Sequence, residues 1–183
     1  MLVRANEASE TVTFHTEPEP ITLNVRDFGA FGDGAHDDTS AIQAAILCCP
    51  ENARVLIPKG TYPVTALFLK SDMILELQEN AVLAGIYDRA RTPILPGQIE
   101  YDNEDGYYNL GSWEGNPIDS FASMITGIHV KNVTICGKGV LDGRADFENW
   151  WSRPKDKIRA WRPRMIFLNH CENITVVGVT VQN

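Results

Sequence analysis

The chain has 183 residues, of which 44% are hydrophobic and 22% are charged, and its formal net charge is −8 at pH 7. This composition is typical of a globular protein and excludes a disordered or collagen-like chain. No apolar run approaches the roughly 18 residues that a membrane span needs, and the acidic balance disfavours nucleic acid as a partner. The first residues lack the basic and apolar segments of a signal peptide, so the sequence predicts a cytoplasmic protein unless a leader has been removed.

Residues 1–20 are polar, contain Pro18 and Pro20, and indicate an extension or a first edge strand. We expect one domain over residues 21–183, because this length suits a single well-filled core. The domain begins with a strand-like segment at residues 21–25, which leads into a glycine-rich turn.

A helix is predicted to follow the acidic pair Asp37 and Asp38 and to end at Pro50. Ser40 and Gln43 have the spacing of a capping box, and the two carboxylates would favour the positive end of the helix. The apolar residues recur at the spacing of one helix face: Ile42, Ala45, Ile46 and Cys49.

After the helix the chain changes to short β-rich runs that are separated by Gly, Asn, Asp or Pro. Regular spacing of this kind indicates a sandwich, a barrel or a coil of repeats. The runs are residues 55–57, 61–62, 66–69, 73–77 and 81–83.

An internal repeat decides between these folds. Residues 124–142 align with residues 165–183 at an offset of 41, with seven of nineteen positions identical, and residues 72–75 are a weaker earlier copy. A sandwich seldom repeats its turn residues in this way. The sequence therefore predicts an all-β fold, a right-handed parallel β-helix with an N-terminal cap helix.

Matched positions of the repeat are predicted to stack on one another in successive coils. Ile135 and Val176 would face the lumen. The two asparagines begin Asn-x-Thr glycosylation motifs, but stacking at a corner explains them without a sugar. The two histidines are expected to stack at the surface, because no carboxylate or cysteine cluster recurs beside them to form a metal site. These corner pairs are Asn132 with Asn173 and His129 with His170.

Two insertions, residues 85–123 and 143–164, interrupt the repeat and are expected to loop out of the coils. The first is rich in aromatic residues, and planar rings suit the faces of sugars; the alternative is a loop that only packs over the edge of the coil. From Arg144 to Arg164 the second contains seven basic and three acidic residues, so this segment could bind an anion.

No residue is assigned a catalytic or metal-binding role, and no cofactor is expected. Hydrolysis of a polysaccharide needs two carboxylates across the scissile bond. However, Asp37 and Asp38 precede a helix and are better explained by capping, and Asp142 follows a strand as a turn residue. The four cysteines have no zinc-site spacing and are predicted to be free, buried thiols: Cys48, Cys49, Cys136 and Cys171.

Several motifs nevertheless resemble a known family. Residues 24–43 are similar to the opening of pectin-degrading β-helix proteins, and residues 55–62 and 67–71 continue that likeness. These segments alone do not separate hydrolases from pectate-lyase-like chains. The later motifs are more specific, and they resemble the family 28 glycoside hydrolases, the polygalacturonases: residues 137–143, 150–151, 162–167 and 171–183.

This resemblance implies inverting hydrolysis of α-1,4-linked galacturonic acid, and the long first insertion is more similar to the exo-acting bacterial branch. In the family, the catalytic aspartates lie in Asn-Thr-Asp and Gly-Asp-Asp blocks, and the chain contains neither block. We therefore expect the 183-residue chain to be inactive by itself, as a β-helix truncated at its C-terminal end.

Polygalacturonate or an oligogalacturonide is the expected partner, and four residues are predicted to contact it: Arg162, Arg164, Trp113 and Tyr108. Arginines can form paired hydrogen bonds with a galacturonate carboxylate. A non-catalytic β-helix that binds acidic glycan, or has only a structural role, remains the alternative. A calcium-dependent lyase ranks last, since no acidic ladder could hold the ion. An uncapped final coil would also lead the chain to self-associate.

Overall fold

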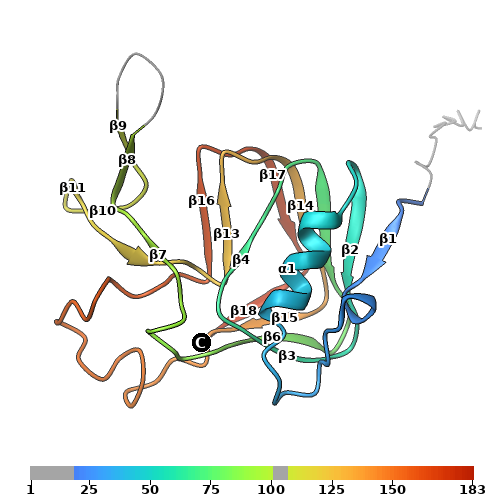
Figure 1. Cartoon of the computed structure of the whole chain (residues 1–183), viewed down its shortest axis with the longest axis horizontal. Helices are drawn as coiled ribbons and strands as arrows, with labels where there is room; N and C mark the ends of the chain where they lie inside the picture. The colour runs from blue at the N-terminus through green and yellow to red at the C-terminus, as the bar shows by residue number, and fades with distance from the viewer. Residues whose placement is uncertain (1–18, 101–106) are drawn as a thin grey trace, which may run out of the picture.

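The computed structural model describes residues 19–100 and 107–183, and most of its strands form a parallel β-helix (Figure 1). Three sheets run along the coils, and every strand pair within them is parallel, which confirms the predicted fold. Sheet A contains β1 (Thr22–Asn24), β2 (Ala53–Ile57), β5 (Met73–Leu77), β14 (Lys131–Gly137) and β17 (Glu172–Val177). Sheet B contains β3 (Gly60–Val64), β6 (Ala81–Gly85), β15 (Val140–Asp142) and β18 (Thr180–Gln182). Sheet C contains β4 (Leu67–Phe68), β13 (Ile125–Ile128) and β16 (Ile166–Asn169).

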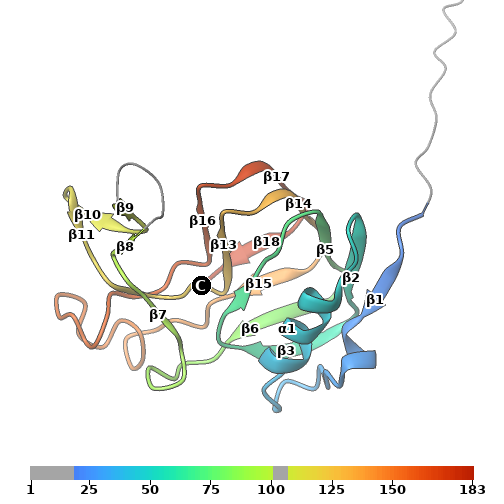
Figure 2. The same ribbon diagram turned by 45° about the horizontal axis from the view of Figure 1, so that its top comes forward.

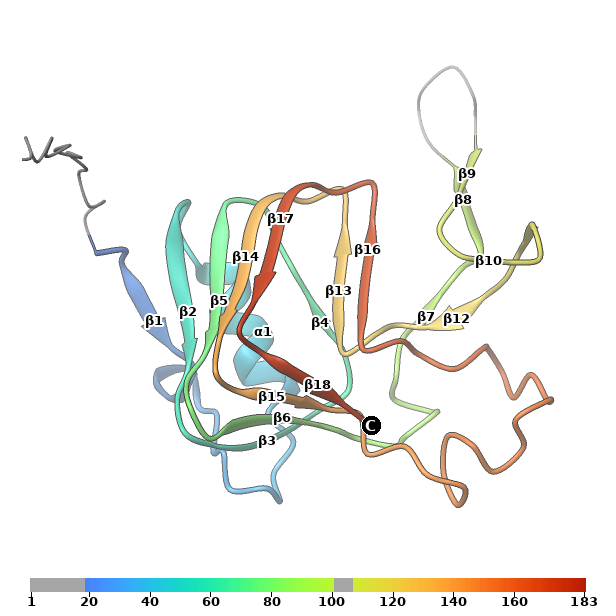
Figure 3. The same ribbon diagram turned by 180° about the vertical axis from the view of Figure 1, so that it is seen from behind.

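The lumen of the β-helix is filled by apolar residues that lie directly above one another. Val55, Leu75 and Ile135 are in register across β2, β5 and β14, and all three are fully buried. Val176 continues this row in β17, as predicted, but its side chain is 44% exposed because no described residue covers the last coil. Figure 3 shows these strands side by side from behind.

A ladder of hydrogen-bonded side chains at the start of the sheet A strands, where the chain turns a corner, supports the same register between coils. Asn132 donates a hydrogen bond to Asp72 over 2.6 Å, and Asn173 donates one to Asn132 over 2.9 Å. All three residues adopt positive φ angles between 52° and 59°, which Asn and Asp tolerate better than most residues. The rings of His129 and His170 also lie next to each other, with centroids 5.2 Å apart and their planes tilted by 34°. Both predicted corner pairs are therefore confirmed.

The repeat offset of 41 residues holds only in part of the coil. The offset of 41 is correct in sheet C, where Ile125 pairs with Ile166, and it is also correct in sheet A. In sheet B the offset falls to 40, so Val140 pairs with Thr180 and not with Val181, its identical match in the repeat. The turn between sheets A and B is one residue shorter in the last coil, which shifts the strand that follows it.

The cap helix α1 (Thr39–Cys48) forms where it was predicted, but it begins differently. Its N-cap residue is Asp38, and Ser40 lies inside the helix, so the predicted capping box is wrong. Gln43 instead bonds to both backbone groups of Phe68 in the first coil, over 2.8 and 2.9 Å. The predicted apolar face is confirmed, with exposures of 1% or less at Ile42, Ala45, Ile46 and Cys49.

The cysteines are free, and their burial varies. Cys49 is buried, Cys136 and Cys171 are half-buried, and Cys48 is exposed, so the prediction of a buried thiol is wrong for Cys48. The buried face of α1 is formed by Ile42, Ala45 and Ile46, and Cys48 lies on the solvent-exposed side of the helix. Burial raises the pKa values of the Cys49 and Cys136 thiols.

The division of the chain into an extension and one domain stays a prediction, since residues 1–18 lie outside the described part. A short 3₁₀ helix (Val25–Phe28) follows β1 and leads into the glycine-rich turn. Among the described residues, no helix is long and apolar enough to cross a membrane.

Replacing Gly137 by alanine should break the stacking of the coils. Gly137 has a φ of +111°, and a Cβ there would overlap the carbonyl oxygen of Leu77 in the coil below. We expect Gly137→Ala to lower the free energy of unfolding by about 2–4 kcal/mol. Gly29→Ala is the matched control, because Gly29 also has a positive φ but no atom lies within 4 Å of its Cβ position. Its cost should be about 1 kcal/mol. Equal losses in urea unfolding would contradict the role of close stacking.

We propose that a polypeptide of residues 1–183 self-associates through its last coil. Val176 and Val181 belong to the lumen rows but are 44% and 49% exposed, and β17 and β18 have a free edge. A second copy could cover these residues and pair with the edges. Val176→Lys should therefore shift the chain toward monomer in sedimentation velocity, with Lys138→Arg as a control. A wild-type chain that stays monomeric on concentration would contradict the proposal.

Candidate functional site

Two long excursions leave the β-helix at the same corner, between sheets B and C. The first excursion (residues 86–124) connects β6 to β13, and the second excursion (residues 143–165) connects β15 to β16. Figure 2 shows the hairpins of the first excursion standing away from the coils. The strands of the first excursion are β7 (Ile94–Leu95), β8 (Gln98–Glu100), β9 (Tyr107–Asn109), β10 (Ser112–Trp113), β11 (Asn116–Pro117) and β12 (Ser120–Phe121).

The two excursions pack against each other and form a small second core. Phe121 and Trp150 are buried there with Ala160, and their rings meet edge to face with centroids 5.2 Å apart. Their backbones are also joined, because the amide of Phe121 donates to the carbonyl of Trp161 over 2.8 Å. The amide of Trp161 in turn donates to the carbonyl of Asp119 over 2.9 Å. The second excursion is thus joined to the first by an isolated parallel β-bridge between Ser120 and Trp161.

A pocket of about 360 Å³ lies where the excursions meet the ends of the sheet B strands, and we call it the corner pocket. The described residues that line it include no aspartate and no glutamate. Its walls are aromatic and aliphatic, and its charged groups are two arginines. The lining residues that matter for chemistry are Thr65, Thr92, Trp150, Trp151, Arg162 and Arg164.

The side chains of the two arginines contact aromatic rings, and none of the ion pairs among the described residues includes either arginine. The guanidinium of Arg162 lies 4.2 Å from the ring centroid of Trp151, and that of Arg164 lies 5.8 Å from the ring of Phe167. The amide of Arg164 donates to the hydroxyl of Ser123 over 3.1 Å. Stacking fixes the plane of a guanidinium and leaves its N–H edge available. The corner pocket is therefore suited to an anion that carries an apolar face.

The structure places the four predicted contact residues at different locations. The structure brings Arg162 and Arg164 together in the corner pocket. Trp113 does not line that pocket; it is 63% exposed in β10 and stacks on Trp161 with centroids 6.4 Å apart. Tyr108 lies in β9, where its backbone pairs with Ile99, and its side chain lies outside the described part. Whether any of the four contacts a ligand stays a prediction.

Sequence reasoning did not select Trp151 as a contact residue. In the sequence, Trp150 and Trp151 contribute only to a family motif. Two adjacent indoles beside a basic segment would nevertheless indicate a site that binds a ligand with an apolar face and a negative charge. What the sequence could not show is that Trp151 lies under Arg162, because this contact depends on how the second excursion folds back.

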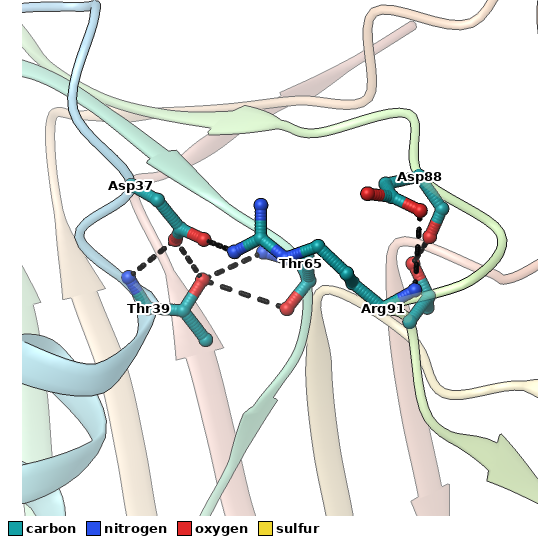
Figure 4. A network of polar contacts seen from close by, with 6 residues as sticks. Asp37, Thr39, Thr65, Asp88 and Arg91 are labelled. Carbon is teal, nitrogen blue, oxygen red and sulfur yellow. Dashed lines mark hydrogen bonds and ion pairs between the residues drawn. The ribbon is translucent and has the colours of Figure 1, made fainter.

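The acidic pair before α1 has structural roles, and the contacts of Asp37 are drawn in Figure 4. Asp37 accepts hydrogen bonds from the amide and hydroxyl of Thr39 over 3.0 and 2.6 Å, and it forms an ion pair with Arg91 of the first excursion. The Thr39 hydroxyl also accepts a hydrogen bond from the amide of Thr65 over 3.0 Å. Asp38 is buried and accepts the amides of Phe31 and Gly32 over 2.7 and 3.0 Å.

These contacts agree with a structural role and not with catalysis. Neither Asp37 nor Asp38 lines the corner pocket. Burial acts to raise the pKa of Asp37, but the hydrogen bonds from Thr39 and the charge of Arg91 outweigh it, so that pKa is lowered. Asp142 is the last residue of β15 and not the predicted turn residue after the strand; its side chain accepts the amide of Arg144 over 3.0 Å. Among the described residues, no group of three or more His, Cys, Asp or Glu is placed to hold a metal ion.

Comparison with known proteins identifies relatives of the whole described fold. The family described as rhamnogalacturonase A/epimerase, pectate lyase-like, matches residues 22–135. An exo-poly-alpha-D-galacturonosidase of Dickeya chrysanthemi is 38% identical over 148 residues, which are 81% of this chain and 23% of that protein. The structure of the family 28 exopolygalacturonase of Yersinia enterocolitica superimposes with a TM-score of 0.75 and 30% identity, over 94% of this chain and 36% of that one.

A third relative matches a shorter stretch. A mannuronan C5-epimerase of Azotobacter vinelandii is 48% identical over 64 residues, which are 34% of this chain and 7% of that protein. Part of the chain is therefore shared with proteins named for other reactions. The chain spans between about a quarter and a third of the length of the two galacturonan-degrading relatives.

Removing the charge of Asp37 should weaken the fold in a pH-dependent way. We expect Asp37→Asn to lower the free energy of unfolding at pH 7 by about 1 kcal/mol, because a partly exposed ion pair and its hydrogen bonds are lost. The folded-state pKa lies below the ordinary 3.8. The carboxylate therefore stabilises the fold fully above about pH 4, and this contribution is lost as the pH falls through the folded-state pKa.

The difference between wild type and Asp37→Asn should accordingly shrink below about pH 4 in urea unfolding. Glu79→Gln is the control, since it changes an exposed carboxylate outside this network. A difference that grows on acidification would show that the pKa of Asp37 is raised in the folded state.

Proposed function

Because the chain belongs to the rhamnogalacturonase A/epimerase, pectate lyase-like family and is a relative of family 28 exo-polygalacturonases, we propose that it acts in the hydrolysis of polygalacturonate. Its described residues would bind and orient the glycan at the corner pocket. The observation that carries this proposal is the pair Arg162 and Arg164, which face the pocket without a lining carboxylate to neutralise them.

A galacturonate unit combines the two properties that the corner pocket matches. Its carboxylate can accept paired hydrogen bonds from a guanidinium, and its ring has an apolar face that suits an indole. Arg162 is stacked on Trp151, so its N–H edge is held in one plane. We assign Arg162 the carboxylate contact and Arg164 a second, supporting contact. Trp113 would contact a unit of the glycan outside the pocket, and the contact of Tyr108 stays a prediction from the sequence.

The same pocket lacks the groups that the bond cleavage requires. Inverting hydrolysis uses a carboxylic acid and a carboxylate about 6.5–9.5 Å apart, and the described lining of the corner pocket contains neither Asp nor Glu. The role of these residues is therefore binding, and a polypeptide of residues 1–183 should bind without turnover. Exo action is supported by the two exo-acting relatives and by the first excursion, which forms one wall of the pocket.

A non-catalytic β-helix that binds acidic glycan is the second candidate. It is favoured by the same lack of carboxylates in the pocket lining. The two candidates predict the same contacts and differ in whether the protein acts in the release of product.

Binding of trigalacturonate is the test of the proposal. Arg162→Gln should weaken its affinity about tenfold or more in calorimetry, because a charged hydrogen bond contributes about 1.5–3 kcal/mol. Arg153→Gln is the matched control: it removes the same charge from the same excursion, but Arg153 is 65% exposed and does not line the pocket.

The outcomes test the assigned binding site and the expected lack of turnover. Neutral galactotriose should bind at least tenfold more weakly than trigalacturonate, and reducing ends should not accumulate with residues 1–183 alone. Release of reducing ends would show that these residues contain the catalytic groups. Equal losses in Arg162→Gln and Arg153→Gln, or no binding by wild type, would contradict the assigned site.

A further inference from the structure

We infer that Arg89 is a positioning residue that sets the geometry of the corner pocket from outside it. Arg89 belongs to the first excursion and does not line the pocket. Its side chain instead joins the two excursions, and the position of Arg162 depends on that junction. The expected effect of Arg89 on glycan affinity rests on the proposed function, whereas its effect on the junction between the excursions is tested without a ligand.

The guanidinium of Arg89 lies among three aromatic rings. Its central carbon is 4.7 Å from the ring centroid of Trp150, 5.5 Å from that of Phe121 and 5.7 Å from that of Tyr87. Trp150 comes from the second excursion, and the other two rings come from the first. The cation is therefore attracted to ring faces on both sides of the junction.

Hydrogen bonds cross the junction in both directions. Arg89 donates to the backbone carbonyl of Ile158 over 3.3 Å and approaches that of Trp150 at 3.5 Å. In return, the side chain of Arg159 donates to the backbone carbonyl of Arg89. We call this reciprocal set of contacts the Arg89 clasp. The two excursions thus hold each other through side chains as well as through the backbone bonds at Trp161.

The Arg89 clasp connects directly to the group that would bind the anion. Trp150 is only 6% exposed and is followed by Trp151, whose ring lies under Arg162. On the other side, the backbone of Trp161, the residue before Arg162, is bonded to Asp119 and Phe121. Arg162 is therefore supported by Trp151 on one side and by Trp161 on the other. The positions of both depend on the packing between the excursions, in which Arg89 takes part.

The chemistry of the clasp requires an arginine. The ion pairs found among the described residues do not include Arg89; its partners there are ring faces, two backbone carbonyl oxygens and the hydroxyl of Tyr87, which lies 3.4 Å from its Nε. A planar guanidinium can stack on an indole and donate to two carbonyls at once, whereas a lysine ammonium is a compact point charge without that planar fork. Arg89→Lys should therefore fail to restore the junction even though it keeps the charge.

The binding test compares Arg89→Met and Arg89→Lys with wild type. We expect each variant to weaken trigalacturonate binding about tenfold, the lower end of what losing an outer supporting residue costs at a site. Arg54→Met is the matched control, because Arg54 also bonds to several partners, Glu19, Thr22 and Glu76, but on sheet A. It should lower Tm while leaving affinity within about twofold.

Hydrogen exchange tests the junction without a ligand. The amides of Phe121 and Trp161 should exchange at least tenfold faster in Arg89→Met and Arg89→Lys, while amides of β5 and β14 keep their wild-type protection. In Arg54→Met the amides of Phe121 and Trp161 should stay protected. This measurement depends only on the clasp and holds even if the protein binds a different ligand.

The outcomes distinguish the role of Arg89 at the junction from the proposed binding of the glycan. Faster exchange with weaker binding supports it fully. Absence of trigalacturonate binding by wild type, together with faster exchange in the variants, would overturn the proposed function but support the clasp. Unchanged exchange in Arg89→Met, full recovery in Arg89→Lys, or a lowered Tm with unchanged affinity would overturn the positioning role.

Discussion

The requirement that each coil lie in register on the one before it determines the rest of this structure. Val55, Leu75 and Ile135 fill the lumen as one row, and Asp72, Asn132 and Asn173 form the ladder at a corner. A residue added within a strand would shift every side chain after it to the opposite face. Extra chain can therefore leave only at a turn, and both excursions use the corner between sheets B and C. A site at this corner is a consequence of the stacking.

This constraint also explains how much of the fold could be predicted. Lumen rows and corner stacks repeat along the sequence, so the alignment of residues 124–142 with residues 165–183 indicates a β-helix. Local patterns were less informative. Ser40 and Gln43 have capping spacing, but Gln43 bonds to Phe68 in the first coil because that backbone would otherwise lack partners. Likewise, the identical Val140 and Val181 are not paired, since one turn is shorter.

The candidate site was predictable in its charge but not in its architecture. The basic segment around Arg162 and Arg164 is visible in the sequence. The stacking of Arg162 on Trp151, and the contacts of Arg89 with three rings, depend on how two excursions without repeats fold against each other. No periodicity governs such segments, and the orientation of a guanidinium over a ring has no signature in sequence spacing.

The relatives show why function should be sought in the excursions. The 64-residue stretch shared with a mannuronan C5-epimerase and the longer match to an exo-poly-alpha-D-galacturonosidase concern proteins named for different reactions. The cap helix and the first coils lie within residues 22–135, which match the family, and they supply a rigid base whose residues are used for stacking and capping. The second excursion carries Trp151, Arg162 and Arg164, and none of these is needed to fill the lumen. Changes in the excursions can therefore alter ligand recognition while the register of the coils, and with it the stability of the fold, is preserved.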